Sequence, residues 1–77
     1  MIDELIKKAM QTRMENNIPF YSHQFQDLVE WGSHYHDKMY TAESYSRAFR
    51  KLRERGDIKT GIFKKGRQNG YHILEIR

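Results

Sequence analysis

The sequence predicts a small α+β fold in which three amphipathic helices are followed by a β-hairpin. Three observations lead to this prediction. Apolar residues recur at helical spacing over residues 2–15 and again over 41–55, two strand-like runs at 58–63 and 71–76 flank a glycine-containing turn, and the chain has only 77 residues. A chain of this length holds one hydrophobic core, so we expect a single domain over residues 1–77.

The first predicted helix covers residues 2–15. Its apolar residues follow a 3.6-residue period and comprise Ile2, Leu5, Ile6, Ala9, Met10 and Met14. We expect this face in the core, with a dimer contact as the alternative. Asn16 and Asn17 tolerate left-handed backbone and are expected to end the helix. Residues 18–21 include Pro19, which edge strands tolerate, so they are predicted to form a short edge strand.

A second helix is predicted over residues 23–31, with Ser22 as its N-cap and Gly32 as its end. Its inward face consists of Phe25, Leu28 and Val29. Trp31 lies off this face, and we expect it to be partly buried. Residues 33–40 are then predicted to form a polar loop, longer than the turn of about 3–4 residues in a plain helix-turn-helix.

This loop contains His34, His36 and Asp37, whose side chains are suitable metal donors. A metal site needs further ligands, and the sequence does not identify any. We therefore interpret the segment as a polar connection between helices, and we predict no metal and no cofactor.

The third predicted helix, between Thr41 and Arg55, has the most regular pattern. Its apolar stripe consists of Tyr45, Ala48, Phe49 and Leu52. Thr41 is predicted to be the N-cap, and Tyr40 and Tyr45 are placed to form a hydrophobic staple across it. Gly56 is expected to end the helix in left-handed backbone. The opposite side of the helix carries Glu43, Arg47, Arg50 and Glu54.

The hairpin is predicted to consist of strands 58–63 and 71–76 joined by residues 64–70. Asn69-Gly70 is a strong turn signal, but this connection is too long for a two-residue hairpin unless the strands extend towards it. Alternation places Ile58, Thr60, Ile62, Tyr71, Ile73 and Glu75 on one face. It places His72, Leu74 and Ile76 on the other. Which face is buried stays open at this point.

Positive charge is concentrated in the second part of the chain. Residues 1–45 hold four Lys/Arg against seven Asp/Glu, a balance of −3, whereas residues 46–77 hold ten against three, a balance of +7, which together give the formal +4. This asymmetry predicts a polyanionic partner for the C-terminal half. The absence of cysteine excludes disulfides and thiol chemistry. No apolar run approaches the ~20 residues of a membrane span, so we expect a soluble, cytoplasmic protein without a membrane partner.

The order of elements, together with residues 41–58, resembles the winged helix-turn-helix superfamily. The matching residues are Thr41, the run Ser44-Tyr45-Ser46-Arg47-Ala48-Phe49-Arg50-Lys51-Leu52, and Gly56-Asp57-Ile58. The resemblance implies the order helix, short strand, helix, helix, strand, wing, strand. It also implies a protein that binds double-stranded DNA, with the third helix in the major groove and the basic turn as a wing on the backbone or the minor groove. The compact format is similar to that of small phage-encoded or mobile-element transcriptional regulators. Double-stranded DNA is the expected partner, and a homodimer and a protein partner stay open.

The same resemblance assigns DNA contacts to individual residues. Base contacts fall on the N-terminal half of the third helix, at Ser44, Ser46, Arg47 and Arg50. Phosphate contact is an equal alternative for Ser44 and Ser46. Lys51 suits a phosphate, and Lys64, Lys65 and Arg67 would contact DNA from the wing tip. The alternative interpretation is a solvated helix face, because Glu43 and Glu54 stand four residues from Arg47 and Arg50 respectively.

Other functions have less support in the sequence. No paired acids or nucleophile–base spacing indicates an enzyme. A second hypothesis is a winged-helix module that binds a protein partner in a replication or transcription complex, through the acidic first helix and Trp31. RNA binding is the third, and the sequence alone shows no aromatic pair arranged on a sheet face to stack on bases.

Overall fold

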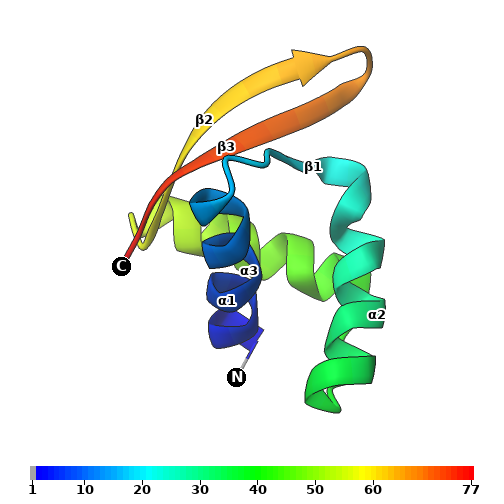
Figure 1. The fold of residues 1–77 in the computed structure, drawn as a ribbon. Helices are drawn as coiled ribbons and strands as arrows, with labels where there is room; N and C mark the ends of the chain where they lie inside the picture. The colour runs from blue at the N-terminus through cyan, green and yellow to red at the C-terminus, as the bar shows by residue number, and fades with distance from the viewer. Residues whose placement is uncertain (1) are drawn as a thin grey trace.

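A computed structural model of the chain describes residues 2–77 (Figure 1). The elements in chain order are α1 (Ile2–Glu15), β1 (Phe20–Tyr21), the 3₁₀ turn η1 (Ser22–Gln24), α2 (Phe25–His36), α3 (Ala42–Glu54), β2 (Ile58–Lys65) and β3 (Gln68–Ile76). The predicted α+β arrangement is confirmed, with three helices beneath a three-stranded antiparallel sheet. The strand order is β1-β3-β2, so the last strand in the chain is the central one.

α1 has the predicted bounds. Asn17, two residues after the helix, adopts left-handed backbone with φ 54°, and the Ile18 amide donates to the Arg13 carbonyl over 2.9 Å. This backbone conformation turns the chain out of the helix and towards β1. The predicted edge strand is shorter than 18–21, because only Phe20 and Tyr21 pair with β3.

α2 differs from its prediction at both ends. Residues 22–24 form the 3₁₀ turn η1, and Ser22 is not the N-cap of α2, which is Gln24. Gly32 does not end the helix; α2 continues to His36 and ends at Asp37, whose φ is 52°. Asp37 can supply this left-handed position because a short polar side chain tolerates it. The connection to α3 is therefore shorter than the predicted loop 33–40.

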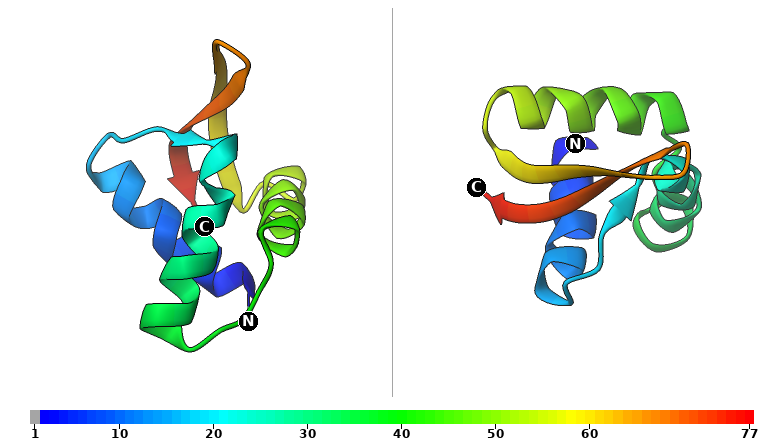
Figure 2. Two further views of the ribbon diagram at one scale, coloured as in Figure 1. Left: turned by 90° about the vertical axis from the view of Figure 1, so that its right-hand side faces the viewer. Right: turned by 90° about the horizontal axis from the view of Figure 1, so that it is seen from above.

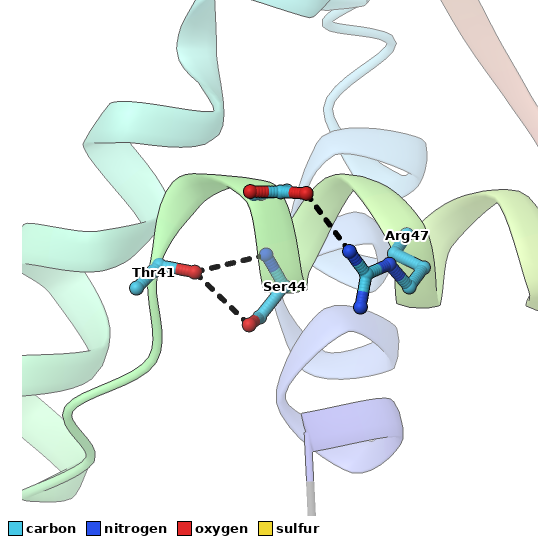
Figure 3. A network of polar contacts seen from close by, with 4 residues as sticks. Thr41, Ser44 and Arg47 are labelled. Carbon is cyan, nitrogen blue, oxygen red and sulfur yellow. Dashed lines mark hydrogen bonds and ion pairs between the residues drawn. The ribbon is translucent and has the colours of Figure 1, made fainter.

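α3 confirms the predicted local signals. The Thr41 side chain accepts a hydrogen bond from the Ser44 amide at 3.1 Å (Figure 3), and the rings of Tyr40 and Tyr45 meet edge to face at 5.8 Å across this cap. Gly56 follows the helix with φ 80°, as expected for its end. The whole predicted stripe is buried: Tyr45, Ala48, Phe49 and Leu52.

The hairpin turn lies at Gly66 and Arg67, within the predicted connection 64–70 and beside the predicted tip cations, and the Asn69-Gly70 signal does not mark it. Both strands extend to this turn, where Lys65 pairs with Gln68. Gly66 has φ 64° whereas Arg67 has no positive φ, which is the pattern of a two-residue type II′ turn. Such a turn matches the twist of the strands. Because both strands extend to it, Asn69 and Gly70 pair with Lys64 and Phe63 as residues of β3. Gly70 instead lies within β3 and is buried.

A β-bulge decides which face of the hairpin is buried. Lys59 pairs with Glu75, but Thr60 pairs with Ile73, so Leu74 is an extra residue in β3. The simple alternation expected along this strand is therefore interrupted. Ile73 is buried and Ile76 packs against the same core, whereas Leu74 is 64% exposed.

One continuous core joins the helices to the sheet. Its buried residues are Leu5, Ile6, Met10, Phe20, Phe25, Leu28, Tyr45, Ala48, Phe49, Leu52, Ile58 and Ile73. The rings of Phe20, Phe25 and Phe49 contact one another at centroid distances of 4.9 to 5.8 Å, which ties β1 and α2 to α3. Over residues 2–77, no helix has both the length and the apolar character that crossing a membrane requires.

Candidate nucleic-acid interface

The exposed face of α3 brings together three of the predicted contact residues. Ser46, Arg47 and Arg50 line a shallow hollow of about 220 Å³ together with Glu43. Ser46 and Arg50 share a flank of the helix with Arg53, at helical spacings of four and three. Arg53 contacts the sheet, so this flank is the one next to the hairpin.

Both arginines of this hollow are held by glutamates of the same helix. Arg47 donates to Glu43 over 2.8 Å (Figure 3), and Arg50 lies 4.0 Å from Glu54. All four side chains are more than half exposed, and such i,i+4 pairs stabilise a helix by only ~0.2–0.5 kcal/mol. The arginines can therefore exchange a carboxylate for a phosphate or a base at little cost, although the carboxylates themselves repel phosphate.

Ser44 and Lys51 lie on the other flank of α3. The Ser44 hydroxyl accepts a hydrogen bond from Thr41 Oγ1 at 3.0 Å, so the side chain takes part in the helix cap (Figure 3). Lys51 is exposed and has no ion pair among residues 2–77. Ser44 is thus the predicted residue least free to contact a ligand, while Lys51 remains free to contact a phosphate.

The remaining two arginines of this region hold the fold together. The Arg53 guanidinium lies over the ring of Tyr71 at 4.8 Å and donates through Nε to Thr60 Oγ1 at 3.0 Å. Arg55 forms an ion pair with Asp57 at 2.6 Å. The hydrogen bond from Arg55 lowers the pKa of Asp57 below its ordinary value. Both arginines lie outside the set of predicted contact residues.

The hairpin tip, defined here as Lys64, Lys65, Gly66 and Arg67, projects beyond the body of the helices (Figure 1). Its three cations are exposed, and none has an ion pair in the part of the chain that the structure describes. Lys64 and Lys65 point to opposite faces of the hairpin, because they are consecutive residues of one strand. The Lys65 ammonium lies 5.9 Å from the centre of the Tyr21 ring.

Six of the eight predicted contact residues therefore form two groups. Ser46, Arg47 and Arg50 lie on α3, which runs beside β2 (Figure 2), and Lys64, Lys65 and Arg67 lie at the hairpin tip. Ser44 and Lys51 lie on the far flank of the helix. The two groups place five exposed cations on one helix and one projecting hairpin: Arg47, Arg50, Lys64, Lys65 and Arg67.

Sequence reasoning missed a set of rings on the face of the sheet turned away from the helices. Tyr21, Phe63 and His72 lie together there, with His23 beside Tyr21. The signal in the sequence is the pair of glycines opposite these residues, since Gly61 pairs with His72 and Gly70 pairs with Phe63. Recognising it requires the strand register, which the predicted connection over residues 64–70 left undetermined.

The histidines near the end of α2 do not join a metal-binding group. The His36 ring packs against Trp31 with a centroid distance of 4.5 Å, and His34 is exposed on the helix. Within residues 2–77 no three His, Cys, Asp or Glu side chains are grouped so that they could hold a metal ion.

Comparison with protein-family models, curated proteins and solved structures gives no match for this chain.

Proposed function

We propose that this chain is a winged-helix protein that binds double-stranded DNA as a small transcriptional or phage regulator. In this proposal α3 enters the major groove, and the hairpin tip is the wing that contacts the backbone or the neighbouring minor groove. The observation that carries the proposal is that two groups of cations lie on adjacent elements. One group is Lys64, Lys65 and Arg67 at the hairpin tip, which have no ion pairs among residues 2–77, and the other is Arg47 and Arg50 on α3.

The chemistry of the two groups suits different parts of a duplex. Arg47 and Arg50 carry planar guanidinium groups that match the O6 and N7 acceptors of guanine. Lys64, Lys65 and Arg67 can neutralise phosphates and so release counterions. The slim tip supports a groove contact, because Gly66 adds no side chain where the hairpin reverses.

The salt dependence of binding tests this division of roles. If Arg47, Arg50, Lys51 and the three tip cations each meet a phosphate, log K should fall with log salt with a slope of about −5. If Arg47 and Arg50 read bases instead, the slope falls to about −4. Selection from random duplexes would supply the target sequence for the measurement, and half-sites about 10 bp apart would indicate a homodimer.

Matched variants separate the proposed face from general positive charge. The pair Arg47→Ala with Arg50→Ala should abolish sequence preference and weaken duplex binding strongly. The pair Lys8→Ala with Lys38→Ala removes the same charge from exposed positions outside the proposed face and should have little effect. Equal losses in the two pairs, or no duplex binding at about 50–100 mM salt, would contradict the proposal.

A groove between α1 and α2 favours a second candidate, a module that binds a protein partner. The groove has a volume of about 340 Å³, and its lining residues are Ala9, Thr12, Arg13, Ile18, Asp27, Leu28 and Trp31. Trp31 is half-buried there, and Ile18 is half-exposed. A single stoichiometric partner that is lost in Trp31→Ala, without any duplex binding by the intact chain, would favour this candidate.

A further inference from the structure

The outer face of the sheet carries four rings in a continuous row, which we call the aromatic row: His23, Tyr21, Phe63 and His72. His23 stacks on Tyr21 at 5.8 Å, Tyr21 meets Phe63 edge to face at 5.9 Å, and Phe63 stacks on His72 at 4.6 Å. The rings come from η1 and from all three strands. Residues that are distant in sequence are thus brought into one surface by the strand register.

Two glycines lie opposite residues of this row, and one of them makes room for a ring. Gly70 pairs with both Tyr21 and Phe63, and the Phe63 ring occupies the space that a Cβ atom on Gly70 would take. Gly61 pairs with His72, so that ring also has no side chain opposite it. A Cβ atom on Gly70 would displace the Phe63 ring, whereas a Cβ atom on Gly61 would meet only the Cβ of His72, at 3.9 Å, so the arrangement of the row depends on Gly70.

The row is open to solvent and continues into positive charge. β3 packs on α1 through its other face, and in Figure 2 (right) no helix lies over the outer face of the sheet. Tyr21 and Phe63 are half-buried, while His23 and His72 are exposed. The Lys65 ammonium lies 5.9 Å from the Tyr21 ring, and the unpaired cations of the hairpin tip follow it.

At its other end, next to His72, the row adjoins a hollow of about 330 Å³. The lining residues of this hollow are Arg13, Asn17, Ile18, His72, Ile73 and Leu74. It offers a polar and partly apolar continuation of the surface beyond the last ring. A flexible ligand can therefore run from the hairpin tip, across the rings and into this hollow.

We propose that the outer face of the sheet binds single-stranded nucleic acid, with unpaired bases on the aromatic row and phosphates beside Lys65 and Arg67. Exposed rings next to a cationic groove are the combination by which proteins hold unpaired strands, since every base has a π-face and every linkage carries a negative charge. Bases within a duplex are already stacked on each other and cannot use this surface. The site is distinct from the α3 face proposed for duplex DNA.

Fluorescence anisotropy with the full chain tests the proposal, using labelled strands of about 12 nucleotides. The strands are oligo-dT, oligo-rU and an abasic strand of the same length. We expect dT or rU to bind at least about fivefold more tightly than the abasic strand. The tighter of the two identifies the preferred sugar. Equal affinity for the abasic strand overturns the proposal, as does a poly-glutamate peptide that binds as tightly as dT, which would indicate an acidic protein partner.

Variants of the row locate the effect. His72→Ala and Tyr21→Leu should each lower dT affinity several-fold towards that of the abasic strand, whose own affinity should not change. Tyr35→Ala removes a ring that is 77% exposed on α2, away from the sheet, and should leave dT binding unchanged. An unchanged dT affinity in His72→Ala overturns the proposal, since this exposed residue can be replaced without loss of the core.

Two further measurements separate the loss of this site from misfolding of a variant and from failure of the duplex-DNA proposal. In the wild-type chain, the ring protons of Phe63 and His72 should shift upfield in NMR spectra when dT is added, and the absence of a shift contradicts base stacking. Arg47→Ala with Arg50→Ala should leave dT binding unchanged, and His72→Ala should leave duplex binding unchanged. Either surface can therefore fail without the other.

Discussion

The hydroxyl group of Tyr45 lies over the bare Cα of Gly32, in the space that a Cβ atom would occupy. Tyr45 is completely buried, and its hydroxyl has no hydrogen-bond partner among residues 2–77. Burial raises the pKa of this hydroxyl above its ordinary value, because the phenolate would lose its hydration. The contact joins α2 to α3 and explains why a glycine stands inside a helix.

The contact between Gly32 and Tyr45 predicts that Gly32→Ala changes the free energy of unfolding in opposite directions with and without the Tyr45 hydroxyl. A double-mutant cycle tests this. Gly32→Ala should destabilise the wild-type chain by about 1–3 kcal/mol, because the new methyl group overlaps the Tyr45 hydroxyl. In the Tyr45→Phe background the same substitution should stabilise the chain by up to ~1 kcal/mol, since alanine favours the helix over glycine. Urea denaturation of the four proteins measures the coupling. Destabilisation by Gly32→Ala in both backgrounds would contradict the contact.

A second glycine prediction concerns the outer face of the sheet. Gly70→Ala should destabilise the chain by about 1 kcal/mol and move the Phe63 ring away from Tyr21, because the added methyl group occupies the position of the ring. Gly61→Ala is the matched control. A Cβ there meets only the Cβ of His72, at 3.9 Å, so the variant should be neutral or slightly more stable. Unfolding midpoints and nuclear Overhauser contacts between Tyr21 and Phe63 distinguish the two.

The glutamates of the α3 face predict a gain of binding. Replacing Glu43 and Glu54 by glutamine removes two carboxylates that repel phosphate and frees Arg47 and Arg50 from their ion pairs. Duplex DNA should then bind roughly 3- to 10-fold more tightly at low salt. Glu15→Gln with Glu30→Gln changes the net charge equally on other helices. If this control gains as much affinity, the effect is one of overall charge and the proposed face is wrong.

The ion pair of Arg55 and Asp57 predicts a pH dependence. The folded-state pKa of Asp57 is lowered by the hydrogen bond from Arg55, so the stabilisation is present above the unfolded-state pKa and is lost as the pH falls through the folded-state value. An NMR titration of the Asp57 carboxyl should give a midpoint below the ordinary aspartate range. Arg55→Gln should raise that midpoint. No change in this variant would mean that Arg55 is not the cause.

Helical periodicity predicted most of the fold from sequence, and the hairpin was predicted least well. The stripe of α3 and its Thr41 cap depend on neighbours within one or two turns, and both are confirmed. The end of α2 and the position of the hairpin turn depend on distant partners. Gly32 lies inside a helix because Tyr45 packs on it, and Gly70 lies inside a strand because Phe63 covers it. Local signals could not report either contact.

The candidate functional residues also include some that the sequence predicted and some that it did not. The arginines and hairpin cations were identified from sequence because charge is visible residue by residue. The aromatic row was not, because Tyr21 and Phe63 become neighbours only through a register that also contains a bulge after Lys59.

The central place of β3 has a consequence for how the chain is made. β3 follows the other elements in the sequence and yet pairs with both other strands. During synthesis, Phe20 is therefore made before Tyr71, its pairing partner in β3. A growing chain that ends before residue 68 has its helices but no sheet to close over Phe20 and Ile58. We expect such intermediates on the ribosome to expose apolar surface and to bind chaperones until the final strand emerges.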